Sequence, residues 1–251
     1  MNDRLKDRAI LVTGAAGAIG RATAERLSIE GARLVLADRP GTPLEQICTE
    51  LGKGHSAAFY DAAASGSGET LVQGAVAALG RLDGVCNIAG VYGKARSTDV
   101  TDVDWNLCLQ VNLTSAFTIA RGAIPHLART RGCVVSTSSL AALEGLAYST
   151  AYAVAKAGII AMTKSLAAEY ASAGIRFNAV CPGAIRSGMS AAKPVPDADP
   201  DLTFRRSKLL GFEGGLGEPR DAAAAFAYLV SDDARFVSGS VLVVDGAQFQ
   251  I

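Results

Sequence analysis

The chain alternates short apolar runs with longer stretches in which apolar and polar positions are mixed. The short runs predict strands, and the longer mixed stretches predict helices. Within the strands the apolar residues form continuous runs instead of strict alternations, which is typical of strands that are covered on both faces. Strands are predicted at 9–14, 32–38, 55–60, 82–90, 132–139, 175–183 and 240–246. Helices are predicted at 18–30, 42–51, 69–79, 103–128, 150–171 and 219–230.

Regular alternation of strand and helix predicts βαβ units with right-handed crossovers and therefore a parallel sheet. The expected fold class is α/β, a single-domain Rossmann-like doubly wound parallel sheet of about seven strands with helices on both faces. The 251 residues suit one such domain over 1–251, and no repeat or linker divides them. The segment 188–217 has no predicted regular element, and its prolines, glycines and apolar second half favour a substrate lid.

Composition narrows the classes of function. Lys plus Arg equals Asp plus Glu, 24 against 24, so no strong basic field exists to bind nucleic acid or a membrane surface. The five cysteines are far apart and form no CxxC pair, so we expect free thiols in a reducing compartment and no metal site. No signal-peptide core is visible, and the longest uncharged stretch, 105–120, is too short and polar to span a bilayer. A cytoplasmic protein is expected.

A glycine-rich turn joins the first predicted strand to its helix. Gly14, Gly17 and Gly20 in "LVTGAAGAIG" allow a tight turn and a close approach of the backbone to a ligand. The N-terminus of the following helix offers free N–H groups to a pyrophosphate. Tight packing alone is the alternative explanation of these glycines.

An acidic residue ends the second predicted strand. Asp38 lies 18 residues after Gly20, where nucleotide-binding sheets place a carboxylate that bonds the ribose 2′-hydroxyl. The stretch Thr42–Glu45 has the pattern of a capping box for the next helix, which would leave Asp38 free for a ligand. The carboxylate favours NAD over NADP, whereas the neighbouring Arg39 would suit a 2′-phosphate.

A tyrosine and a lysine stand alone in the apolar run "AYAVAKAGIIA". Tyr152 and Lys156 are four apart and therefore share one face of a helix. Because a nearby ammonium favours the phenolate, this pair could form a general acid/base with a lowered pKa. A chance surface pair is the alternative, which the apolar surroundings disfavour.

Further motifs follow in a fixed order: "TGAAGAIG" at 13–20, "NIAG" at 87–90, "YAVAK" at 152–156, "NAVCPGAIRS" at 178–187 and "VLVVDGA" at 241–247. Ser139 precedes Tyr152 by 13 residues, and Asn112 lies in the helix after "NIAG". Over nearly its whole length the chain thus resembles the classical short-chain dehydrogenases/reductases, although Ala18, Ile88, Ser187 and Ala247 replace residues usual in that family.

The resemblance implies a role for each motif residue. Tyr152 would be the general acid/base, and Lys156 would lower its pKa and bond the nicotinamide ribose. Ser139, chosen over Ser138 by its spacing, would orient the substrate oxygen, and Asn112 would hold a water that links Lys156 to solvent. Asp61 would contact adenine, unless it is a solvated turn residue. The implied cofactor-binding residues are Gly14, Gly17, Ile19, Gly20, Asp38, Asp61, Asn87, Ala89, Gly90, Tyr152, Lys156, Pro182, Gly183, Ile185 and Ser187.

The function expected is an oxidoreductase that transfers a hydride between NAD(H) and a secondary alcohol or ketone. One alternative is an NADP-dependent carbonyl reductase of the 3-oxoacyl type, and a second is a non-catalytic nucleotide-binding regulator on the same fold. Tyr92, Leu146, Tyr148 and Ala184 would line the substrate site together with Ser139, which suggests a mostly apolar substrate. The apolar helices 103–128 and 150–171 resemble those that pair in the family's oligomers, so we expect a homotetramer, with a dimer second.

Overall fold

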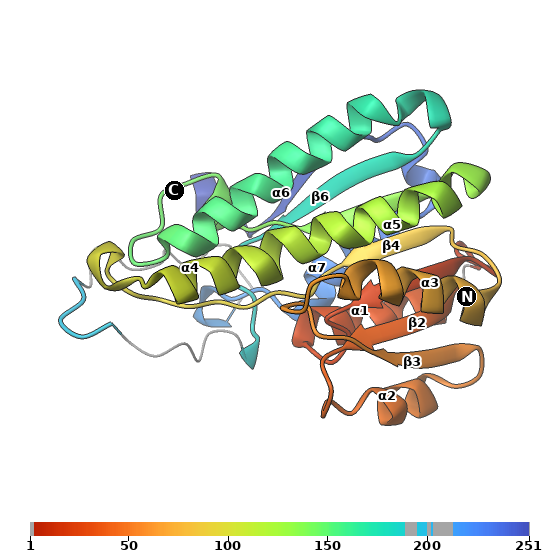
Figure 1. Ribbon diagram of the computed structural model, residues 1–251, viewed down its shortest axis with the longest axis horizontal. Coiled ribbons are helices and arrows are strands. Elements are labelled where there is room, and N and C mark those ends of the chain that lie inside the picture. The colour runs from red at the N-terminus through yellow and green to blue at the C-terminus, as the bar shows by residue number, and fades with distance from the viewer. Residues whose placement is uncertain (1–2, 189–194, 200–201, 203–212, 251) are drawn as a thin grey trace.

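A seven-stranded parallel sheet forms the centre of the molecule (Figure 1). The computed structural model describes residues 3–188, 195–199, 202 and 213–250. The strands follow the order β3-β2-β1-β4-β5-β6-β7, and every neighbouring pair is parallel. Their bounds are β1 Ala9–Thr13, β2 Arg33–Asp38, β3 His55–Phe59, β4 Gly84–Asn87, β5 Cys133–Thr137, β6 Arg176–Pro182 and β7 Val241–Val244. The predicted doubly wound α/β fold is confirmed.

Helices cover both faces of the sheet and bury its apolar strands. One core cluster joins the sheet to α1, α2 and α7, and the other joins it to α3, α5 and α6. Both faces of the central strands therefore lie in apolar surroundings, which explains their unbroken apolar runs. The helices span α1 Ala18–Ile29, α2 Leu44–Leu51, α3 Ser67–Leu79, α4 Asp102–Leu109, α5 Ser115–Thr130, α6 Thr150–Glu169 and α7 Pro219–Val230.

The strand order reverses between β1 and β4, which are hydrogen-bonded neighbours. From β1 the chain proceeds outward through β2 to β3, and then returns across β1 to β4. The connections that leave the two strands consequently diverge to opposite sides and open a crevice at the strands' carboxyl ends. Asp38, Asn87 and Pro182 end their strands at this edge of the sheet, and the other residues predicted to bind cofactor or substrate lie in the connections that follow the strands.

The starts of α7 and α2 differ in how they are capped. Helix α7 begins with a true capping box, in which the side chains of Glu218 and Asp221 each accept a backbone N–H of the other's residue, with Pro219 in the first turn. The box predicted at Thr42–Glu45 is wrong: α2 starts at Leu44 with no side-chain cap, and the Thr42 hydroxyl donates to the carbonyl of Arg39 instead.

The helix predicted over 103–128 is not a uniform α-helix. A π-helical stretch, Gln110–Thr114, separates α4 from α5, although the three segments follow one another without a break. Such a stretch adds one residue to a turn and is frequent at functional sites. It contains Asn112, so the change in pitch occurs at the polar residue that the sequence singles out.

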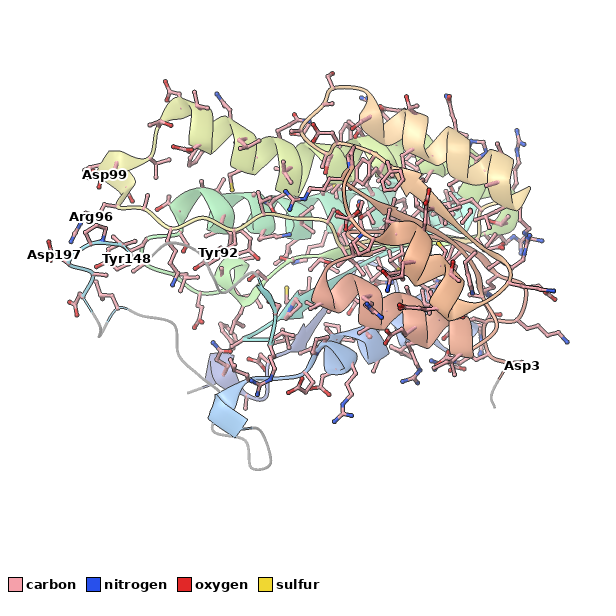
Figure 2. The ribbon with its side chains drawn as sticks, turned by 90° about the horizontal axis from the view of Figure 1, so that it is seen from below. Asp3, Tyr92, Arg96, Asp99, Tyr148 and Asp197 are labelled. Atoms are coloured by element: carbon pink, nitrogen blue, oxygen red, sulfur yellow. The ribbon has the colours of Figure 1, made fainter. Side chains whose placement is uncertain are left out.

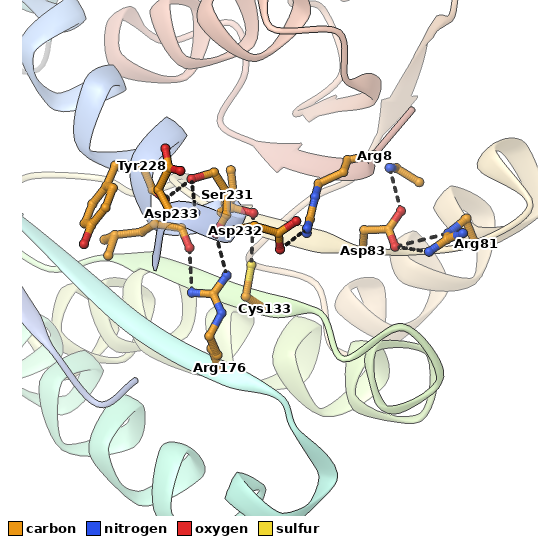
Figure 3. Close-up of polar contacts among 12 residues, drawn as sticks. Arg8, Arg81, Asp83, Cys133, Arg176, Tyr228, Ser231, Asp232 and Asp233 are labelled. Atoms are coloured by element: carbon orange, nitrogen blue, oxygen red, sulfur yellow. Dashed lines mark hydrogen bonds and ion pairs between the residues drawn. The ribbon is translucent and has the colours of Figure 1, made fainter. Parts of the chain in front are cut away.

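Charged and polar side chains tie the opposite end of the sheet together (Figure 3). The guanidinium of Arg176, at the start of β6, donates to the carbonyls of Leu229 and Ser231 at the end of α7, with N–O distances of 2.8 and 3.2 Å. Arg8 forms an ion pair with Asp232 just beyond the same helix. A cation at a helix C-terminus satisfies carbonyls that lack an intrahelical partner and complements the helix dipole. These contacts fix α7 and hold the edge of the sheet that lies away from the motif residues.

Most of the predicted lid, 188–217, lies outside the described residues, so it stays a prediction. Among the helices that the structure describes, none has the length and apolar character needed to cross a membrane. In the same part of the chain, no three His, Cys, Asp or Glu side chains converge as metal ligands. All five cysteines are unpaired thiols, of which Cys48 and Cys108 are half-buried.

Candidate active site

The glycine-rich turn between β1 and α1 is shaped by its own glycines. Gly14 has a φ of +66°, and a Cβ there would lie 2.7 Å from the backbone nitrogen of Ala89. A Cβ on Gly20 would lie 2.0 Å from the carbonyl oxygen of Gly14. Side chains are therefore excluded, and the first turn of α1 keeps N–H groups that have no intrahelical acceptor. This cradle beside the β1/β4 crevice fits the pyrophosphate of a dinucleotide.

Thr13 connects the two sides of the crevice through hydrogen bonds. Its buried hydroxyl accepts the N–H groups of Ile88 and Ala89, at 3.0 and 3.2 Å, and lies 3.2 Å from the side-chain oxygen of Asn87. Asn87 also donates to the carbonyl of Ala116, at 3.1 Å. The amide of Asn87, predicted to bind cofactor, is thus used within the protein. Sequence reasoning missed Thr13, although it stands directly before Gly14 in the turn motif.

Asp38 lies beside the glycine-rich turn but is not free of protein partners. One carboxylate oxygen accepts the N–H of Ala16 at 2.9 Å, and the other accepts the N–H of Arg39 at 2.8 Å. The carboxylate is half-exposed, and each of its oxygens can accept a further bond. Asp61, after β3, is exposed and accepts the N–H of Ala63 at 2.9 Å, which is the geometry of a solvated turn.

Lys156 is buried beside Tyr152 on α6. The lysine is 3% exposed, and its Nζ donates to the carbonyl of Thr137 at 2.9 Å. The same Nζ lies 5.6 Å from the centre of the Tyr152 ring. The predicted shared helical face is confirmed, and the end of β5 holds the ammonium through a backbone carbonyl.

The electrostatics of this pair differ from the prediction. Burial lowers the pKa of Lys156 to about 8, and the thiols of Cys108 and Cys181 act weakly in the opposite direction. Burial raises the pKa of Tyr152 to about 12, while a hydrogen bond with Ser139 lowers it. In the protein without ligands the pKa of Tyr152 is therefore raised and not lowered as expected, because loss of solvation is the largest effect on it.

The two adjacent serines after β5 have different surroundings. The Ser138 hydroxyl is buried and donates to the backbone carbonyl of Lys156 at 2.8 Å. The Ser139 side chain is half-buried, accepts the N–H of Ala141 at 3.2 Å and lies near enough to the Tyr152 phenol to lower its pKa. Ser138 therefore supports α6, and Ser139 reaches the phenol, as its spacing predicted.

Asn112 holds the loop that follows β4. Its side-chain oxygen accepts the N–H of Val91 at 3.1 Å, and its side-chain nitrogen donates at 3.0 Å to the carbonyls of Val91 and Cys108. A Cβ on Gly90 would lie 2.7 Å from that side-chain oxygen and 3.4 Å from the Nζ of Lys156. The Asn112 amide is thus engaged with protein groups and positions the loop, and its predicted role in holding a water beside Lys156 stays a prediction.

The loop after β6 is held by a residue from the end of the chain. The N–H of Ala184 donates to the side-chain oxygen of Gln248 at 2.9 Å, and Gln248 is fully buried. The next residue, Ile185, forms a parallel bridge with Gly217, and both it and Ser187 are half-buried. Pro182 ends β6, and a Cβ on Gly183 would lie 2.6 Å from the Gln248 oxygen. No sequence motif pointed to Gln248.

An aromatic side chain packs directly against Tyr152. The ring of Tyr92 packs edge-on against that of Tyr152, with centres 4.9 Å apart. The Tyr92 hydroxyl lies 3.0 Å from that of Ser149, which is buried. Tyr148 and Leu146, both half-buried, come from the same loop as Ser149. Three of the predicted substrate residues thus lie on the two loops that flank the phenol.

Known proteins are similar to this chain in sequence and in fold. A family model described as enoyl-(acyl carrier protein) reductase matches residues 14–247. Meso-2,3-butanediol dehydrogenase of Serratia marcescens is 32% identical over 97% of this chain and 95% of its own length. Cyclohexanol dehydrogenase of an Acinetobacter species is 33% identical over 98% of this chain and 97% of its own length.

A solved structure agrees with these relatives. A short-chain dehydrogenase of Burkholderia cenocepacia, in complex with NADP, superposes with a TM-score of 0.86 at 28% identity, over 97% of this chain and 98% of its own. The chain therefore belongs to the classical short-chain dehydrogenase/reductase family, oxidoreductases that act on CH–OH groups with a nicotinamide cofactor.

Proposed function

We propose that this enzyme transfers a hydride between NAD(H) and a secondary alcohol or ketone, with Tyr152 as the general acid/base. The observation that carries the proposal is the cluster of Tyr152, Ser139 and Lys156 at the carboxyl end of β5. When bound, the nicotinamide ring accepts or donates the hydride. The Tyr152 oxygen takes the alcohol proton or returns it, and the Ser139 hydroxyl bonds the substrate oxygen. Lys156 presents its ammonium beneath the phenol and toward Gly90.

The other residues proposed to hold the cofactor follow the crevice. The glycine-rich turn with Ile19 would face the pyrophosphate, and Asp38 and Asp61 the adenosine half. Ala89 and Gly90 would face the nicotinamide half from β4, and Pro182, Gly183, Ile185 and Ser187 from β6. Ala184, Tyr92, Leu146 and Tyr148 would border a mostly apolar substrate. The proposed lid at 188–217 would lie on the same side.

Asp38 should decide the choice between NAD and NADP. We expect wild type to have a higher kcat/KM with NAD, because a carboxylate bonds a ribose diol and repels a 2′-phosphate. In Asp38→Ala the preference should fall about tenfold to 100-fold, since a charged hydrogen bond is worth roughly 1.5–3 kcal/mol. Steady-state kinetics with both cofactors measures the ratio.

Glu45→Ala is the matched control, because it removes an exposed carboxylate from the first turn of the following helix, α2. It should leave the ratio unchanged. A wild type that prefers NADP would contradict the proposal and favour the alternative of an NADP-dependent carbonyl reductase. Two observations favour this alternative. Arg39 is exposed beside Asp38, and the structural relative from Burkholderia cenocepacia is in complex with NADP.

The adjacent serines give a second test of the site. Ser139→Ala should lower kcat by about 10²-fold, the scale for loss of one hydrogen-bond donor to a developing oxyanion. Ser138→Ala removes a buried bond to the Lys156 carbonyl and should cost about 1 kcal/mol of unfolding free energy with little effect on kcat. Kinetics and urea unfolding of both variants separate the roles. The opposite assignment, with kcat lost only in Ser138→Ala, would contradict the proposal.

Exposed apolar side chains support assembly into a homotetramer, with a dimer as the alternative. Val103 on α4, Phe117 on α5 and Val154 on α6 are 75%, 40% and 44% exposed. Because α4 packs against α6, and the π-helical stretch 110–114 that continues into α5 contacts both, the side chains can form part of one contact surface. The free thiols support a cytoplasmic location.

A further inference from the structure

Two loops are joined beside Tyr152. One is the extended loop 91–97 after β4, and the other precedes α6 (Figure 2). The N–H of Ala95 donates to the Tyr148 carbonyl at 2.9 Å. Hydroxyl contacts of 3.0 Å join Tyr92 to Ser149 and Ser97 to Thr150. The contacts recur along both loops, which therefore form one continuous wall.

The wall reaches a third segment, 195–199. One Arg96 nitrogen donates to the carbonyls of Asp197 and Pro196, at 2.8 and 3.3 Å. The Tyr148 hydroxyl accepts the N–H of Asp199 at 3.0 Å. Figure 2 shows Arg96, Tyr148 and Asp197 gathered at one end of the molecule. The side chains of Arg96 and Tyr148 thus hydrogen-bond the backbone of the same short segment.

Arg96 and Tyr148 also contact each other. The Arg96 guanidinium lies 5.8 Å from the centre of the Tyr148 ring, within the range of a cation–π contact. Tyr148 has a φ of +63°, a left-handed conformation that is uncommon for a bulky residue. Such strain persists only where the surroundings fix it, and it clusters at functional sites. Here the Ala95 and Asp199 hydrogen bonds and the Arg96 contact fix it together.

We propose that Arg96 and Tyr148 are positioning residues that hold segment 195–199 over the substrate side of the active site and so set the KM for substrate. This inference rests on the proposed function, because it takes Tyr152 as the reacting group. Tyr92 links the wall to Tyr152 through the edge-on ring contact. Arg96 bonds backbone carbonyls, so its contact with segment 195–199 depends on where the segment lies and not on the segment's side chains.

The variants Arg96→Met and Tyr148→Phe test the grip. Each should raise the KM for the alcohol probe about fivefold to tenfold, the effect of losing about one hydrogen bond, with kcat and the Kd of NAD changed less than about twofold. The probe is cyclohexanol or meso-2,3-butanediol, whichever the wild type oxidises. In the double variant the increase should be smaller than the product of the single ones, because both residues hold one segment. Arg96→Lys, which keeps one donor, should recover part of the loss.

Hydrogen exchange gives a readout that does not need turnover. Amides of 195–199 should exchange faster in Arg96→Met and Tyr148→Phe than in wild type, while β5 stays unchanged. Lys94→Met removes a cation from the same loop, one that lies over Tyr92 at 5.8 Å, and should leave both KM and exchange as in wild type.

Unchanged exchange of 195–199 in both Arg96→Met and Tyr148→Phe would overturn the proposal. So would an equal rise in KM for Lys94→Met, or a loss of kcat with KM unaffected. If wild type oxidised no alcohol with either cofactor, the proposed function would fail instead. The exchange measurement would then still decide whether Arg96 and Tyr148 hold the segment.

Discussion

Replacing Tyr152 by phenylalanine is expected to lower kcat by a factor of about 10² or more, with cofactor affinity nearly unchanged. The substitution removes the proton-exchanging oxygen and keeps the ring, which packs against Tyr92. The fold should therefore be preserved, so the loss reports chemistry. Steady-state kinetics and a fluorescence titration with NADH measure the two quantities.

The pH dependence sharpens this prediction. Burial raises the pKa of Tyr152 to about 12 in the protein without ligands, so the phenol is protonated at neutral pH. Alcohol oxidation needs the deprotonated oxygen, and its rate in wild type should increase with pH over the range below that pKa. Residual turnover in Tyr152→Phe should lack this increase.

Tyr228→Phe is the matched control, because it removes a phenolic oxygen from the partly exposed face of α7. It should leave kcat as in wild type. Near-normal turnover by Tyr152→Phe would remove Tyr152 from its proposed role. It would mean that another group near Ser139 exchanges the proton.

The arrangement of strands and helices could be predicted because burial on both faces leaves a direct trace in the sequence. Unbroken apolar runs such as 9–12 in β1 and 34–37 in β2 lie where both core clusters meet the sheet. The start of α7 was also placed correctly, since Pro219 is tolerated only in the first turn of a helix.

Local features that depend on one hydrogen bond could not be predicted in the same way. The stretch Thr42–Glu45 has the composition of a capping box, yet the Thr42 hydroxyl finds the Arg39 carbonyl first. The π-helical stretch at Asn112 adds a single residue to an otherwise continuous helix, and hydrophobic periodicity is too coarse to detect it.

Spacing identified the residues of the candidate site better than it identified their electrostatics. The distance along the chain selected Ser139, and the structure agrees that it, and not Ser138, reaches Tyr152. The pKa of Tyr152 depends on how much of the phenol loses water, which is a property of the packed structure. Gln248 supports Ala184 from 64 residues away, a contact that only the folded chain creates.

Replacing Lys156 by methionine is expected to abolish most turnover without destabilising the protein. The ammonium is buried and donates a hydrogen bond to the Thr137 carbonyl, and burial lowers its pKa from 10.5 to about 8. A shift of that size corresponds to roughly 3 kcal/mol of cost for holding the charge in the fold. Methionine fills a similar volume without that charge, so the unfolding free energy should stay equal or rise by about 2 kcal/mol. Both kcat and cofactor affinity should fall, in contrast to Tyr152→Phe.

The stability difference should depend on pH in a definite direction. Below pH 8 the lysine is protonated in both states, and the folded state bears the full cost. Between pH 8 and 10.5 the unfolded chain binds more protons than the folded one, so wild-type stability rises with pH through this window. The variant has no such group, and its advantage over wild type should therefore shrink by about 2 kcal/mol between pH 7 and 9.5. Urea unfolding at the two pH values measures the change.

Lys164→Met provides the control on the same helix, because Lys164 is exposed. It should alter neither turnover nor the pH dependence of stability. A strongly destabilised Lys156→Met at pH 7 would mean that the ammonium holds α6 to β5 through Thr137 more tightly than burial opposes it. A stable but inactive variant would instead mean that the chain keeps a costly buried charge because the chemistry at Tyr152 and the cofactor requires it.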